Sequence, residues 1–167
     1  MEKFTFKPLT ISDLNLLCEW FDNPHVLEWW DDQLTPAEIK QKYGSRINDD
    51  VVHPHIAYLH NKPIGFIQYY WVNKVGNGWW PNEDNGTVGL DQFIGDENFI
   101  GKGYGTTMIK EFIQFLFHNP AITKIITEAD PNNHRARRCY QKVGFHEEGE
   151  INTPDGKSLL MTMKRQK

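Results

Sequence analysis

Apolar residues along the chain follow two periods, one typical of strands and one typical of helices. Residues 4–8 alternate as a strand, and residues 12–21 carry apolar side chains at helical spacing before Pro24 ends the helix. A second helix is predicted over residues 35–48, because its first residues, Thr-Pro-Ala-Glu, have the composition of a capping box with proline in the first turn. The N-terminal part of the chain is therefore predicted to be one strand followed by two helices.

The rest of the chain predicts a hairpin, a long loop and a series of strands and helices. Segments 55–59 and 64–72 are strand-like and joined by a short turn, and residues 73–86, which include Trp79-Trp80, form a long loop of the kind that is often functional. Four further strands are predicted at residues 88–94, 123–129, 145–151 and 158–164, and two further helices at residues 104–118 and 134–143. This order implies an α/β (α+β mixed) fold, with about seven strands in a mixed sheet and about four helices on its faces.

Composition narrows the class of protein. A chain of 167 residues with 39% hydrophobic and 24% charged residues is expected to be one globular domain over residues 1–167. No apolar run approaches the roughly 20 residues of a membrane span, and the N-terminus lacks a signal-peptide core, so we expect a cytoplasmic protein without a membrane partner. The net charge of -4 disfavours nucleic acid and suits a cationic partner. Cys18 and Cys139 predict neither a disulfide nor a metal site.

A glycine-rich turn between a predicted strand and a predicted helix is the main chemical signal. Gly101, Gly103 and Gly105 alternate just before and within the start of the helix at residue 104. Glycine lets a ligand approach the backbone closely, and exposed N–H groups at a helix N-terminus attract anions, so the turn suits a pyrophosphate. The structural alternative is a tight turn that only needs positive φ angles. The spacing matches neither the Walker motif nor the dinucleotide-binding fingerprint.

The turn resembles the acetyl-coenzyme A pyrophosphate loop of the GNAT superfamily, whose pattern is Gln/Arg-x-x-Gly-x-Gly/Ala. Gly101 and Gly103 fit this pattern, and Asn98 stands where the family has Gln or Arg. A second GNAT-like segment follows, with Asn132-Asn133 and Ala136 before Tyr140 and Gly144-Phe145. The resemblance implies the GNAT fold, with a sheet splayed at the acetyl-coenzyme A site. It also implies a set of cofactor-binding residues: Gln92, Phe93, Ile94, Ile100, Gly101, Lys102, Gly103, Tyr104, Gly105, Thr106, Asn132, Asn133 and Ala136.

Acetyl transfer to an amine needs a neutral amine, a donor to the thioester carbonyl oxygen and a proton for the departing thiolate. By the resemblance, backbone N–H groups of residues 92–94 polarise the carbonyl. Tyr140 is a plausible phenolic donor to the thiolate, and packing under the last strands is the alternative role. No metal or covalent nucleophile is required, so Cys139 is expected to be a small core residue.

The chain also resembles the aminoglycoside 6′-N-acetyltransferases over nearly its whole length. The segments that carry this similarity include His-Val-Leu-Glu-Trp-Trp at residues 25–30, Gln68-Tyr69, Gly78-Trp79-Trp80, Gly-Leu-Asp-Gln at residues 89–92 and Thr-Pro-Asp-Gly at residues 153–156. The resemblance implies that Asp91 receives the substrate amine and acts as its base. It further implies a set of substrate-binding residues: Glu28, Trp30, Tyr69, Trp80, Asp91 and Asp130.

Charge supports a polycationic acceptor. Carboxylates gathered in a cleft would hold a polyamine sugar by charge-assisted hydrogen bonds. The candidate acids are Glu28, Asp31, Asp32, Glu83, Asp84, Asp91 and Asp130. For Asp31-Asp32 and Glu83-Asp84, a solvated loop is an equally good interpretation. Asp91 is the most informative of them, because aspartate is disfavoured inside strands. Within each Trp-Trp pair, we expect one ring in the core and one lining the cleft.

Three alternatives stay open at this point. The acceptor could be another amine, such as a hydroxylysine-type siderophore precursor or a protein N-terminus, or the protein could be a non-catalytic acyl-coenzyme A-binding module. The last would not need Asp91 or Tyr140, and both are present. The sequence leaves open whether the protein is a monomer or a homodimer.

Overall fold

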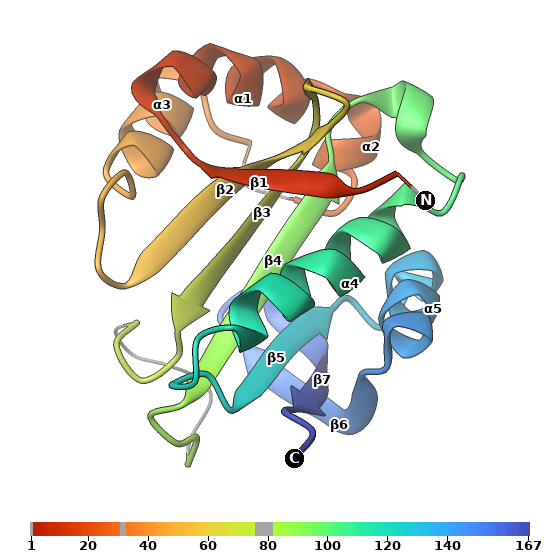
Figure 1. The fold of residues 1–167 in the computed structure, drawn as a ribbon. Coiled ribbons are helices and arrows are strands. Elements are labelled where there is room, and N and C mark those ends of the chain that lie inside the picture. The colour runs from red at the N-terminus through yellow and green to blue at the C-terminus, as the bar shows by residue number, and fades with distance from the viewer. Residues whose placement is uncertain (1, 31–32, 76–81) are drawn as a thin grey trace. The chain divides into compact units, whose positions relative to one another are not determined.

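The computed structural model describes residues 2–30, 33–75 and 82–167, and its strands form a seven-stranded sheet in the order β1-β2-β3-β4-β5-β7-β6 (Figure 1). The strands are β1 (Phe4–Pro8), β2 (Val52–Leu59), β3 (Lys62–Trp71), β4 (Thr87–Ile94), β5 (Lys124–Ala129), β6 (His146–Thr153) and β7 (Gly156–Lys164). The β4–β5 pair is parallel, whereas β1–β2, β5–β7 and β6–β7 are antiparallel. The predicted mixed sheet of seven strands is confirmed.

Five α-helices accompany the sheet in the described residues, one more than the four predicted. They are α1 (Leu14–Phe21), α2 (Pro24–Leu27), α3 (Pro36–Gly44), α4 (Tyr104–Phe117) and α5 (His134–Val143), and two 3₁₀ turns, η1 (Ile11–Asp13) and η2 (Glu97–Phe99), precede α1 and α4. The additional helix is α2. Pro24 ends the preceding helix as expected, but it also starts the next one, because a proline at the first helical position lacks only an N–H that would have no partner there.

The second predicted helix is shorter than expected. Helix α3 begins at the Thr35 capping box but ends at Gly44 instead of near residue 48. The hydroxyl of Ser45 donates to the carbonyl of Lys42 over 2.7 Å. Glycine is a poor helix former, and a serine that satisfies a carbonyl of the last turn favours termination there.

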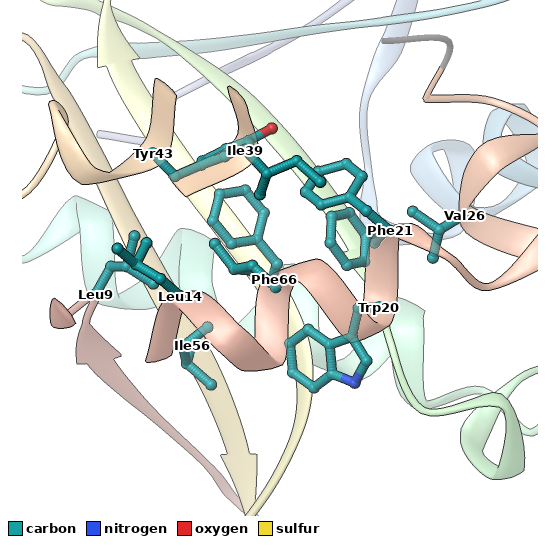
Figure 2. Close-up of a cluster of buried hydrophobic side chains, with 11 residues drawn as sticks. Leu9, Leu14, Trp20, Phe21, Val26, Ile39, Tyr43, Ile56 and Phe66 are labelled. Atoms are coloured by element: carbon teal, nitrogen blue, oxygen red, sulfur yellow. The ribbon is translucent and has the colours of Figure 1, made fainter. Parts of the chain in front are cut away.

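The chain packs as two compact units. The first comprises Met1–Gln68 and Gln92–Gly105, and the second comprises Tyr69–Asp91 and Thr106–Lys167. One domain over residues 1–167 stays a prediction. In the first unit, α1 contacts α3. Figure 2 shows the core of this unit, in which apolar side chains of α1 and α3 meet those of β2 and β3. Its aromatic members are Trp20, Phe21, Tyr43, Phe66 and Phe93.

In the second unit, α4 buries one apolar face, made of Met108, Ile109, Phe112, Ile113 and Leu116. The guanidinium of Arg165 fastens the end of this helix, since it donates to the carbonyls of Phe117 at 2.6 Å, Asn119 at 2.6 Å and Ile122 at 2.8 Å. Lys and Arg side chains near a helix C-terminus satisfy the last carbonyls in this way.

The parallel ladder between β4 and β5 covers three residue pairs, from Thr87 with Lys124 to Gly89 with Ile126, although both strands continue beyond it. Beyond this ladder, a side chain connects the two strands: the buried hydroxyl of Thr127 on β5 donates to the carbonyl of Leu90 on β4 over 2.9 Å. This register agrees with the predicted splay of the sheet. In the described part of the chain, no helix is long and apolar enough to cross a membrane.

Candidate active site

The glycine-rich turn of the first unit has the backbone that an anion site requires. Gly101 and Gly103 adopt φ angles of 73° and 86°, which L side chains rarely adopt, and both residues are exposed. A Cβ atom built on Gly103 would meet no other atom of the protein within 4 Å. The space above this backbone is therefore open, and α4 begins at the next residue, Tyr104. These features fit a pyrophosphate held by backbone N–H groups.

The side chain of Asn98 is turned into the loop. Its side-chain Nδ2 donates to Asp96 Oδ1 over 2.9 Å. The backbone carbonyl of Asn98 accepts a hydrogen bond from Lys102 Nζ over 2.7 Å. Asn98 thus braces the loop at the position where the family pattern has a longer Gln or Arg.

The end of β4 is hydrogen-bonded to α2 and to Asn23, the residue before it. His25 Nε2 donates to the carbonyl of Ile94 over 2.8 Å, and Asn23 Nδ2 donates to the carbonyl of Gly95 over 2.9 Å. Trp20 lies against Gly95, where an added Cβ would come within 2.1 Å of its ring. These contacts hold the strand end that contains Gln92, Phe93 and Ile94, whose backbone was predicted to serve the acyl group.

The two tryptophans after α2 differ in burial, as expected for this pair. Trp30 is half-buried, and its ring packs edge-on against Phe21, Phe66 and Phe93, with ring centroids 5.9, 6.1 and 5.0 Å away. Trp29 is 42% exposed. Glu28 is exposed as well. Trp80, Trp79, Asp31 and Asp32 lie outside the described residues.

In the second unit, Asp91 belongs to an acidic cluster around a buried phenol. Burial is the main cause that raises the pKa of Tyr70 well above its usual value, and the charges of Asp91, Glu128 and Tyr140 raise it further. Tyr70 therefore stays protonated at neutral pH. Its ring lies against Gly89, where an added Cβ would come within 2.1 Å of Cζ. Because Gly89 and Asp91 alternate onto the same face of β4, this phenol and the Asp91 carboxylate share one side of the strand.

Glu128 is a candidate that the sequence analysis did not single out. It is half-buried in β5, and its charge acts on Tyr70 together with that of Asp91. Asp130, which was predicted in this role, is exposed just beyond the strand, and its Oδ1 accepts the N–H of Asn132 over 2.8 Å. Residues two apart point to the same face of a strand, so the difference lies in where β5 ends: the strand includes Glu128 and ends at Ala129, before Asp130.

Helix α5 positions Tyr140 and Cys139. Tyr140 is 5% exposed, and its ring packs edge-on against Phe145 with centroids 5.6 Å apart. Burial raises the pKa of the Cys139 thiol, although a 3.2 Å contact with the Thr106 hydroxyl opposes this effect. A protonated thiol is a poor nucleophile, which suits a structural role for Cys139. At the start of the helix, Asn133 Oδ1 accepts the N–H of Ala136 over 3.1 Å.

Two predicted substrate contacts have other neighbours. Tyr69 packs against Trp71 and Phe112, with centroids 6.5 and 6.4 Å apart, so its side chain lies on the α4 side of β3, opposite that of Tyr70. Glu83 binds Lys124 Nζ through both carboxylate oxygens at 2.9 Å. The charge of Glu83 is therefore paired within the protein, which favours a structural role over contact with a cationic substrate.

A family model described as an acetyltransferase (GNAT) domain matches residues 10–153. The chain belongs to the GNAT acetyltransferase family. The fold and the enzyme class expected from the glycine loop and the α5 segment are thereby confirmed.

Relatives with named substrates cover almost the whole chain. It is 38% identical to an aminoglycoside N(6′)-acetyltransferase type 1 of Klebsiella pneumoniae, over 99% of this chain and 85% of the relative. A crystal structure of the aminoglycoside acetyltransferase AAC(6′)-Ib in complex with coenzyme A and kanamycin matches with a TM-score of 0.92 and 39% identity, over 98% of this chain and 96% of the other. The lysine N-acyltransferase MbtK of Mycobacterium tuberculosis is 23% identical over 92% of this chain and 74% of its own.

Proposed function

We propose that this protein transfers the acetyl group of acetyl-coenzyme A to the 6′-amine of an aminoglycoside. The observation that carries the proposal is the acidic cluster of the second unit, in which Asp91 and Glu128 act on the same buried phenol. Two carboxylates held in this way suit an acceptor with several ammonium groups. The 38% identity to an enzyme named for this activity supports the same acceptor.

We assign one set of residues to the binding of the acetyl donor, acetyl-coenzyme A. Bound acetyl-coenzyme A would supply the activated acetyl group as a thioester. The backbone N–H groups of residues 101–105 bind the pyrophosphate, with Ile100, Lys102 and Thr106 flanking them. Asn132, Asn133 and Ala136 flank the pantetheine arm. The N–H groups of residues 92–94 polarise the acyl carbonyl.

Proton transfers are assigned to two side chains. The Asp91 carboxylate binds the ammonium group and takes its proton, directly or through water, which leaves a neutral amine nitrogen with a free electron pair. Tyr140 Oη holds the proton that the departing thiolate requires. Trp30, Glu28 and Trp80 are proposed contacts of the sugar. We place the reaction in the cytoplasm, where acetyl-coenzyme A is available.

The acceptor is tested by measuring coenzyme A release with 6′-amino sugars of the kanamycin type, lysine derivatives and peptides. A lysine-type acceptor is the second candidate, because one relative is named a lysine N-acyltransferase. Turnover of 6′-amino sugars alone supports the proposal. Turnover of lysine derivatives or peptides, with none of the sugars, replaces it with the second candidate or with a peptide substrate.

Asp91→Asn tests the role of the carboxylate. The change keeps the shape and removes the charge, so transfer should slow by on the order of 10² to 10⁴, the range for a lost general base. Sugar binding should weaken, and added salt should weaken it in the wild type too. Asp155→Asn, in the exposed β6–β7 turn, is the matched control and should keep the wild-type rate. Wild-type transfer by Asp91→Asn would remove Asp91 from the mechanism.

A further inference from the structure

The side chain of Asp96 lies at the start of the glycine-rich loop. A carboxylate is unexpected beside a site that binds an anion. Asp96 follows β4 and precedes η2, and its side chain is 15% exposed. A carboxylate near a bound pyrophosphate repels it. The contacts of Asp96 within the protein therefore have to account for its presence.

Asp96 joins the loop to the start of β3. Its Oδ2 accepts Lys62 Nζ over 2.7 Å, and its Oδ1 accepts both the N–H of Asn98 at 3.0 Å and the amide Nδ2 of Asn98 at 2.9 Å. The backbone N–H of Asp96 also donates to the carbonyl of Ile64 on β3 over 3.2 Å. One carboxylate thus connects a strand to the first residue of the loop.

Lys62 also contacts the loop through an aromatic ring. Its ammonium lies 5.1 Å from the centroid of the Phe99 ring, and Phe99 packs edge-on against Tyr104 with centroids 5.0 Å apart. Tyr104 is the first residue of α4. Lys102 then closes the loop through its 2.7 Å bond to the Asn98 carbonyl. The chain of contacts runs from β3 through both ends of the loop to the helix N-terminus.

The hydrogen bond from Lys62 is the main cause that lowers the pKa of Asp96, and the bonds from Asn98 act in the same direction. The carboxylate is therefore charged at neutral pH, and Lys62 neutralises it. Such an arrangement stabilises one loop conformation without leaving a net negative charge beside the ligand.

We propose that Lys62 and Asp96 are positioning residues, which hold residues 98–103 in the conformation that accepts the pyrophosphate of coenzyme A. This inference rests on the proposed function. In this chain Asp96 accepts two hydrogen bonds from Asn98, the residue that stands where the GNAT pattern has Gln or Arg. The alternative role for Lys62 is direct contact with a phosphate.

Asp96→Asn separates the two roles by the sign of its effect. If Lys62 were a direct phosphate ligand, loss of the neighbouring negative charge would tighten coenzyme A binding. If the pair positions the loop, the same change weakens binding, because the bond that Lys62 makes becomes weaker and the loop loses its anchor. Hydrogen bonds to charged groups support a loss of about tenfold in affinity.

The experiment measures coenzyme A binding by titration calorimetry, together with amide hydrogen exchange of residues 97–103 in the ligand-free protein. Asp96→Asn and Lys62→Met should each raise the Kd about tenfold and speed this exchange, whereas Lys62→Arg should restore both. The double variant should bind no more weakly than either single variant, since one contact is removed. Lys40→Met, an exposed lysine on α3, is the control and should change neither quantity.

Steady-state kinetics add a second distinction. The KM for acetyl-coenzyme A should rise in both variants, while kcat at saturation stays within about twofold of the wild type, because neither residue touches the reacting atoms. Tighter binding by Asp96→Asn, or unchanged Kd and exchange in both variants, overturns the positioning role. A wild-type protein that binds no coenzyme A overturns the proposed function as well, so the two failures are distinguishable.

Discussion

At the scale of single residues, two glycines determine where large rings lie. An added Cβ at Gly89 would come within 2.1 Å of the Tyr70 ring, and one at Gly95 within 2.1 Å of the Trp20 ring. Real Cβ atoms do not approach other atoms so closely, so any side chain at either position must displace a ring. Gly89 thus keeps Tyr70 beside the Asp91 face of β4, and Gly95 keeps Trp20 against the end of the same strand.

Tyr140→Phe tests the proposed proton donor. The ring and its packing against Phe145 remain, and only the phenolic hydroxyl is lost. Turnover should fall on the order of 10² while the Kd for acetyl-coenzyme A stays nearly unchanged, because general-acid assistance acts in the transfer step. Single-turnover rates and calorimetry measure the two quantities. Tyr58→Phe, which removes a phenol from β2, is the control, and a wild-type rate in Tyr140→Phe would leave Tyr140 with a packing role only.

The candidate residues also show what a sequence pattern can and cannot predict. Asp91 was identified because an aspartate inside a strand is unusual, and in the structure its charge, like that of Glu128, acts on the buried Tyr70. Glu128 was missed because the pattern does not show where β5 ends, which is at Ala129, between Glu128 and Asp130. The assignment of Tyr69 to the substrate stays a prediction, and alternation along β3 also brings its ring against Phe112, a contact that the shared segment does not predict.

At the scale of elements, local chemistry predicted most starts and ends well. Thr35 caps α3 and Gly144 ends α5 with φ 117°, as their sequences indicate. The exceptions are the helix boundaries at Pro24 and Ser45. Pro24 both ends α1 and starts α2, and Ser45 satisfies a carbonyl that would otherwise continue α3. Long-range pairing, such as the bond of Lys62 to Asp96, could not be predicted because it depends on which strand lies beside the loop.

The glycine-rich loop allows a prediction with a matched internal control. Gly103→Val forces a β-branched residue into φ 86°, a strain on the order of 1–3 kcal/mol, and places methyl groups in the open space above the loop. Coenzyme A binding should be abolished. Gly156→Val introduces a comparable strain at φ 117° in the β6–β7 turn, again with no neighbour within 4 Å of the added Cβ.

Comparison of the two variants separates strain from ligand contact. Both should lower the melting temperature, which thermal denaturation measures, but only Gly103→Val should lose affinity for coenzyme A in calorimetry. Equal affinity in a folded Gly103→Val variant would remove the loop from the cofactor site. Equal loss in both variants would attribute the effect to general destabilisation.

At the scale of the whole molecule, the net charge affects the approach of the substrate, and one buried histidine links stability to pH. The net charge of -4 favours approach of a polycation at neutral pH. This attraction acts over the distance set by ionic strength, whereas the Asp91 carboxylate acts on the bound amine.

His55 makes folding sensitive to mild acid. It is 7% exposed in β2, its Nδ1–H donates to the carbonyl of His53 over 2.9 Å, and burial lowers its pKa from 6.5 to about 4. Because the folded-state pKa is depressed, the unfolded chain binds a proton below pH 6.5 that the folded protein does not. The stability linked to His55 is thus present above about pH 6.5 and is lost as the pH falls toward 4.

The expected loss in the free energy of unfolding is about 3 kcal/mol between these two pH values, since each unit of pKa shift corresponds to roughly 1.4 kcal/mol. Urea unfolding of the wild type at intervals of pH should reveal this slope, and His55→Gln should lack it because glutamine does not titrate. His60→Gln removes an exposed histidine, with a side chain 70% accessible, and should keep the wild-type slope. Asp96 and Glu38 also have lowered pKa values, and their contributions are lost as the pH falls below the unfolded values of 3.8 and 4.5, but both residues are the same in all three proteins and cancel in the comparison. An unchanged slope in His55→Gln would therefore assign the acid sensitivity to groups other than His55.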